Sequence, residues 1–149
     1  MTSMKNIEWL LDDARFLFSH ARFSGALLTL LCAVQALSST RSEKTDRQKF
    51  VAFLGERLSS HTGVGELRIQ VKSPGRLPLL QEILYDYLRC PIIHEGKHLI
   101  RQEDADSSVC LDFSEGAPSV SSDGRKVTFG GRWLCNVLAG LVKDGLTDT

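Results

Sequence analysis

The sequence predicts a mainly α-helical bundle with a small β-hairpin or meander before its last helix. Two observations support this class: apolar residues recur at helical spacing in long segments, and three short β-rich segments precede the final helix. A chain of 149 residues with 42% hydrophobic and 24% charged residues has the composition of one soluble globular domain, expected over 1–149. Its formal net charge of zero argues against a large non-specific nucleic-acid surface but leaves room for a local anion site.

Three helices are expected in the first part of the chain. Ser3 is a suitable N-cap for the first, whose apolar face comprises Ile7, Leu10, Leu11, Ala14, Leu17, Phe18 and Ala21. The second, from about Ser24 to Ser38, is apolar nearly all round, which predicts a central position in a bundle. Its apolar stretch "GALLTLLCAVQAL" is too short to span a membrane. Thr45 should cap the third helix, whose core residues would be Phe50, Val51, Phe53, Leu54 and Leu58.

The segment from Ser59 to Arg76 is predicted to be a loop with a short extended piece at Leu67–Val71. A fourth helix should begin near Leu77–Pro78, with Leu79, Leu80, Ile83, Leu84, Tyr87 and Leu88 as its apolar residues. "VCLDF", "SVSS" and "KVTF" are candidate strands, with an Asp-Gly turn signal in "SDGRK". The last helix would bury Trp133, Leu134, Val137, Leu138, Leu141 and Val142.

The four cysteines, Cys32, Cys90, Cys110 and Cys135, are far apart and match no zinc spacing. Cys32 and Cys135 lie in apolar runs, where a thiol behaves as a small hydrophobic group. The N-terminal segment is too acidic and too interrupted for a signal peptide. These features predict a protein of the reducing cytoplasm, without a membrane segment.

The stretch "YLRCPIIHEG" places Arg89 and His94 on either side of Pro91. On an uninterrupted helix, these two residues would point about 140° apart. Proline cannot donate a hydrogen bond to the Tyr87 carbonyl, and its ring disfavours helical geometry at the preceding residue. The helix should therefore kink or end at Pro91, and the two side chains are then free to converge.

Arginine and histidine together suffice for RNA cleavage without a metal or cofactor. Histidine titrates near neutral pH and can take the 2′-OH proton, while a guanidinium stabilises charge on the phosphate. An arginine followed four to six residues later by a histidine is nevertheless expected about once by chance in such a chain. Arg15 and His20 match the same pattern. The Arg–His spacing therefore indicates a site only where the surrounding sequence supports it.

That context resembles the HEPN superfamily of small helical nucleases and nucleotide-associated domains. "DARFLFSHARFSGALLTLLCAVQAL" looks like the first two family helices, and "DRQKFVAFLGERL" looks like the next. "LYDYLRCPIIHEG" looks like the signature segment, in which an arginine, four to six residues and a histidine occupy a late bundle helix. The resemblance implies a HEPN-like bundle of about five helices with a core over about 3–100. The strands and last helix, over about 107–145, would be an addition to it.

The resemblance also implies a homodimer in which two signature segments face each other, so that each composite site takes Arg89 and His94 from both chains. In catalytic members, the residue after the arginine is typically polar, often Asn, Asp or His. Here it is Cys90, and a thiol is a weak hydrogen-bonding group. The hydrogen bond that this polar residue would make in catalytic members is therefore weakened or lost in this chain.

Structural interpretations of the same residues remain open. His94 can donate to the backbone at a helix end, and Arg89 can pair with Asp86 or Glu82. His94 and His98 have the spacing of two metal ligands but lack the H-E-x-x-H order and a third ligand, so no metal is expected.

Two functions follow from the sequence. The first is a metal-independent endoribonuclease of HEPN type, a toxin or defence component, with Arg89 stabilising the phosphate and His94 as general acid and base. Its partners would be RNA and a cognate antitoxin or regulatory protein. The alternative is a catalytically silent HEPN-like dimer that serves as an interaction or regulatory module. Zero net charge and Cys90 favour the alternative, whereas the Arg89–His94 pair around a proline favours the nuclease.

Overall fold

The computed structural model describes residues 4–63, 79–89, 109–122 and 127–148, which form two compact units. The first unit combines the described residues before 64 with those from Cys135 onward, and the second contains the described residues from 79 to 134. The boundary at Cys135 falls inside the last helix.

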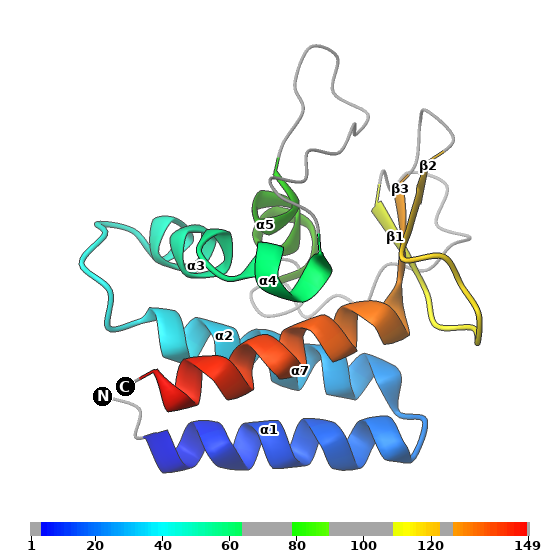
Figure 1. Ribbon diagram of the computed structural model, residues 1–149, viewed down its shortest axis with the longest axis horizontal. Coiled ribbons are helices and arrows are strands. Elements are labelled where there is room, and N and C mark those ends of the chain that lie inside the picture. Colours follow the sequence, from blue (N-terminus) through cyan, green and yellow to red (C-terminus); the bar gives the residue numbers. More distant parts are fainter. Residues whose placement is uncertain (1–3, 64–78, 90–108, 123–126, 149) are drawn as a thin grey trace. The chain divides into compact units, whose positions relative to one another are not determined.

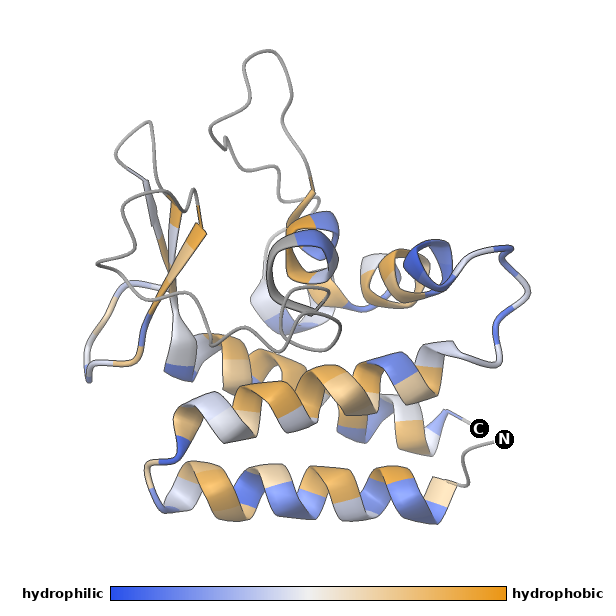
Figure 2. Cartoon of the chain, turned by 180° about the vertical axis from the view of Figure 1, so that it is seen from behind, coloured by the Kyte–Doolittle hydropathy of each residue, from blue (hydrophilic) through white to orange (hydrophobic). Residues whose placement is uncertain are grey.

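Helices α1 (Met4–Ser19) and α2 (Phe23–Ser38) form an antiparallel pair in the first unit (Figure 1). α1 buries Ile7, Leu11 and Ala14, whereas α2 buries residues along its whole length. Figure 2 shows hydrophobic and hydrophilic residues alternating along α1 and hydrophobic residues predominating on α2. The expected amphipathic first helix and central second helix are confirmed, while the expected cap, Ser3, lies outside the described residues.

The α1–α2 turn corrects one assignment. Ala21 was expected on the apolar face of the first helix, but α1 ends at Ser19 and Ala21 is exposed with a φ of 58°. Its neighbour Arg22 donates a backbone hydrogen bond to the Leu17 carbonyl, 2.8 Å away. Helices commonly end in this way, with one residue in the left-handed conformation followed by a backbone hydrogen bond to the last turn. The left-handed position is usually occupied by glycine.

Helix α3 (Asp46–Gly55) begins where the sequence predicts. The Thr45 side chain accepts from the Gln48 amide, and the Gln48 side chain accepts from the Thr45 amide, both at 3.1 Å. This reciprocal capping box satisfies two amides that the helix leaves free. A short helix, α4 (Leu58–Thr62), follows and ends at Gly63, which has a φ of 74°. The start of the predicted 59–76 loop is therefore helical, and the extended piece at 67–71 lies outside the described residues.

Helix α7 (Gly131–Thr147) runs alongside α2 in the same direction (Figure 1). At the start of both helices, the Cys135 thiol donates to the Phe23 carbonyl at 3.9 Å. Towards their ends, Gly145 lies so close to Leu37 that an added Cβ would be 2.9 Å from its side chain. Leu134, Val137, Leu138, Leu141 and Val142 on α7 are buried, which confirms these members of the predicted apolar face. Trp133, which was also expected to be buried, is only half-buried.

The second unit contains the helical segment α5 (Leu80–Ile83) and η1 (Leu84–Arg89) and a three-stranded sheet. The strands are β1 (Val109–Asp112), β2 (Val120–Ser122) and β3 (Val127–Gly130), close to the predicted positions. None of the helices in the described part of the chain is long and apolar enough to cross a membrane.

The order of the strands corrects the expected meander. The sheet has the order β1-β3-β2, with β1 parallel and β2 antiparallel to β3. Parallel strands need a connection of about a dozen residues or more, and the segment 113–126, which contains β2, is long enough. β1 and β3 are mostly buried, whereas Ser121 and Ser122 on β2 are exposed. The serine-rich strand β2 therefore takes one edge of the sheet and β1 the other, and the two apolar strands, β1 and the central β3, pair.

Candidate functional site

The helix that bears Arg89 departs from α geometry before it reaches Pro91. It begins as α-helix at Leu80, where the Glu82 carboxylate accepts from the Leu79 amide at 3.0 Å. From Leu84 to Arg89 it is a π-helix, with backbone bonds from i to i+5. The sequence reasoning expected a distortion at Pro91 but not this change five residues earlier.

The π-helix ends at Arg89, so it does not bear on the 140° estimate between Arg89 and His94, whose intervening residues lie outside the described part of the structure. A wider helix turns less per residue, so faces counted at 3.6 residues per turn do not extend through Leu84–Arg89. Such segments are rare and occur frequently at functional sites. The Arg89 side chain, and all of Cys90, Pro91, His94 and His98, lie outside the described part of the structure.

The start of this segment is buried. Leu80, Ile83 and Leu84 are fully buried, and Tyr85 is 8% exposed. Asp86, one of the two expected structural partners of Arg89, is exposed. The helix that leads to Arg89 therefore begins with buried residues.

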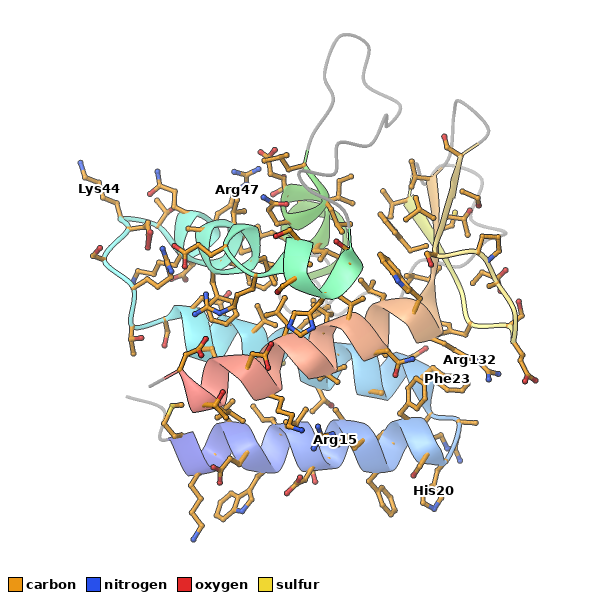
Figure 3. All side chains as sticks on the ribbon, viewed as in Figure 1. Arg15, His20, Phe23, Lys44, Arg47 and Arg132 are labelled. Atoms are coloured by element: carbon orange, nitrogen blue, oxygen red, sulfur yellow. The ribbon has the colours of Figure 1, made fainter. Side chains whose placement is uncertain are left out.

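The second pair with the same spacing, Arg15 and His20, does not form a joint site. Figure 3 shows the Arg15 side chain directed from α1 towards α7, whereas His20 points away from the bundle. The His20 imidazole lies against the Phe16 ring, with 4.2 Å between centroids, and its Nδ1 donates to the Phe16 carbonyl at 2.9 Å. Residues five positions apart on an α-helix point about 140° apart, so Arg15 and His20 do not share a face.

The structure also contains a histidine–carboxylate pair that sequence reasoning missed. Nε2 of His61 on α4 donates to Oδ2 of Asp144 on α7 at 2.6 Å. A carboxylate that orients an imidazole is a feature of acid–base sites. However, an added Cβ at Gly140 would lie 3.0 Å from the other ring nitrogen, so the α7 backbone covers that side of the ring. The pair therefore connects α4 to α7. The two residues are 83 positions apart, and no local pattern links them.

The chain shows no match to known protein-family models, curated proteins or solved structures. The fold therefore defines the class only as a mainly α-helical protein with a small mixed sheet before its last helix. Within the described residues, no group of three or more His, Cys, Asp or Glu side chains is placed to hold a metal ion.

Proposed function

We propose that this protein is a metal-independent endoribonuclease of HEPN type that acts as a homodimer. The observation that carries the proposal is the change from α- to π-helix over Leu84–Arg89, which includes Arg89 and ends two residues before Pro91. A π-helix is an energetically unfavourable irregularity that persists frequently at functional sites. It supports the interpretation of this segment as a built site rather than a regular surface helix.

In the proposed reaction, His94 of one protomer takes the proton of an RNA 2′-OH. The 2′ oxygen attacks the adjacent phosphorus, and the bond from phosphorus to the 5′ oxygen of the next nucleotide breaks. His94 of the partner subunit returns a proton to that leaving oxygen. The products are a 2′,3′-cyclic phosphate and a 5′-hydroxyl, and no electrons are exchanged.

Arg89 stabilises the negative charge that grows on the phosphate oxygens as the new bond forms. The guanidinium presents a planar fork that can contact two phosphate oxygens at once, and it remains charged at any physiological pH. Lysine has a single compact ammonium group and cannot reproduce this contact. A ribonuclease of this kind acting as a toxin or defence component would be held in check by a cognate antitoxin or regulatory protein.

The test compares RNA cleavage by four purified proteins, the wild type and three variants, in excess EDTA. Wild type should cleave, His94→Ala should lose cleavage by about a hundredfold or more, and Arg89→Lys should be impaired. His20→Ala is a matched control, because His20 belongs to a motif of the same spacing but is engaged on α1. It should cleave as wild type does. Far-UV circular dichroism and thermal melting should show all four folded alike.

The alternative is a catalytically silent dimeric interaction or regulatory module. Cys90, in place of the polar residue that typically follows the arginine, favours it, since a thiol is a weak hydrogen-bonding group. If the wild-type dimer cleaves no RNA and His94→Ala sharply lowers the melting temperature, His94 is structural. The module then replaces the nuclease.

A further inference from the structure

The helical unit contains a pocket that is separate from the signature segment. It has a volume of about 290 Å³ and lies between α1, α2 and α7. Its lining residues are Ala14, Arg15, Phe18, Leu30, Cys135, Asn136, Ala139 and Gly140. All of them belong to the first compact unit, whereas Arg89 belongs to the second. The pocket's function is therefore independent of the proposed nuclease activity.

Most of the pocket wall is apolar. Ala14, Leu30 and Cys135 are buried, and Phe18 is half-buried. α7 presents the small residue Ala139 at the pocket wall, where a larger side chain would fill the space. A volume near 300 Å³ is at the lower end of the range for small-molecule sites.

The polar groups of the pocket all favour one charge sign. The Arg15 guanidinium points from α1 towards α7 (Figure 3) and makes no ion pair with another described residue. Asn136 contributes a neutral amide, which can donate two hydrogen bonds. None of the described residues that line the pocket is acidic. Burial raises the pKa of the Cys135 thiol to about 12, so this group stays neutral and does not repel an anion.

We infer that this pocket binds a small monocarboxylate with an apolar body, such as a short fatty acid. A single guanidinium matches a carboxylate through two parallel hydrogen bonds, and the Asn136 amide can donate to the same group. One positive charge balances one negative charge, which favours a carboxylate over a doubly charged phosphate. The apolar body would lie against Phe18, Leu30 and Ala139.

The test uses octanoate as the probe, with octanol and octylamine as ligands of matched length. Each is titrated into ¹⁵N-labelled full-length protein, and the amide resonances of Asn136, Ala139 and Gly140 are followed by NMR. Octanoate should give saturable shifts at these residues with a Kd below about 1 mM. Octylamine should give none, and octanol should bind at least about tenfold more weakly.

Two substitutions and one control separate the pocket from general surface effects. Arg15→Gln should weaken octanoate binding by about tenfold to a hundredfold, since a charged hydrogen-bond partner is lost. Ala139→Phe should remove binding by filling the pocket. Arg22→Gln removes an exposed arginine outside the pocket and should leave the Kd within about twofold of wild type. If Ala139→Phe fails to fold, the comparison of Arg15→Gln with Arg22→Gln decides the question.

Three results would overturn the inference: no saturable shift at the pocket residues, octanol binding as tightly as octanoate, or equal weakening by Arg15→Gln and Arg22→Gln. None of them bears on RNA cleavage, because the probe and the variants do not involve Arg89 or His94.

Discussion

Burial controls the chemistry of the Cys135 side chain. The residue is 1% exposed, and loss of hydration of the charged form raises its pKa to about 12. Its thiol donates only a long hydrogen bond to the Phe23 carbonyl. The sequence predicts that Cys135 behaves as a small hydrophobic group, and its burial confirms this prediction. Cys32, for which the sequence makes the same prediction, is only half-buried.

We predict that Cys135 resists alkylation in the folded protein. At pH 8, roughly one thiol in ten thousand with such a pKa is ionised, and the thiolate is the reactive form. Iodoacetamide followed by peptide mass spectrometry should label Cys32 well before Cys135, while the protein unfolded in urea should label both. Labelling of Cys135 as fast as Cys32 under native conditions would contradict the assignment.

Arg41 connects the α2–α3 turn to the end of α3. Its guanidinium donates to Glu43, at 2.9 Å from Nε, and to Glu56, at 2.8 Å from Nη2. These side-chain hydrogen bonds lower the pKa of both carboxyl groups below the ordinary 4.5. Both carboxylates are substantially exposed to solvent, so the network contributes little to stability.

We predict a pH-dependent effect of Arg41→Gln. A carboxyl group with a lowered folded pKa stabilises the protein above its unfolded pKa, and this contribution is lost as the pH falls through the folded pKa. Thermal melting should show Arg41→Gln slightly less stable than wild type at pH 7. The difference should shrink below about pH 4. Arg22→Gln, outside the network, should show no such trend, and a difference that grew on acidification would refute the explanation.

At the scale of elements, a pair of glycines sets the junction between the sheet and α7. An added Cβ at Gly130 would lie 2.6 Å from the Pro118 backbone oxygen, and one at Gly131 would lie 2.2 Å from the Phe113 ring. Arg132 then donates from Nε to the Phe113 carbonyl at 2.7 Å. Glycine is required here for close approach, and the β3 strand can pass directly into the helix because no side chain intervenes.

We predict that Gly130→Ala destabilises the protein by about 1–3 kcal/mol, because a backbone oxygen cannot move aside as a side chain can. Gly25→Ala on α2 is the matched control. Its added Cβ would meet only Leu17 at 3.5 Å, an ordinary contact, and helix propensity favours alanine by up to about 1 kcal/mol. Urea denaturation measures both. Equal free energies of unfolding for Gly130→Ala and wild type would show that the junction relaxes freely.

At the scale of the whole molecule, the proposed nuclease requires two chains. The apolar pair Ile92–Ile93 lies between Arg89 and His94 in the sequence and has the character of an interface core. A competing surface exists on α1, where Trp9 is 56% and Phe16 is 63% exposed. Solvent-exposed aromatic residues also favour association.

We predict a homodimer of about 33 kDa, twice the 16.5 kDa of one chain, in sedimentation velocity at about tens of micromolar protein. Ile93→Asp should dissociate it and remove RNA cleavage together. Phe16→Ser, on the competing surface, should leave both unchanged. A monomer at these concentrations, or a dimer that only Phe16→Ser dissociates, would argue against the composite site.

Local patterns in the sequence were sufficient for the positions of most elements. The spacing of apolar residues located α1, α2 and the last helix, and Thr45 as a capping residue located the start of α3. These signals depend on residues within a few positions of one another, which is why they can be read without the fold. The Arg89–His94 motif was also visible in sequence, but whether the two side chains converge depends on backbone geometry that no spacing rule supplies.

The sequence by itself determined a mainly helical chain, three short strands and a proline-flanked arginine and histidine. Only the tertiary structure decided the parallel pairing of β1 with β3, the π-helix before Arg89, the His61–Asp144 link and the Arg15 pocket. Each of these depends on groups distant in sequence or on competition between alternative backbone hydrogen bonds. Helical and strand periodicity arises from each residue's nearest neighbours, whereas strand order and pockets arise from how separate elements share one core.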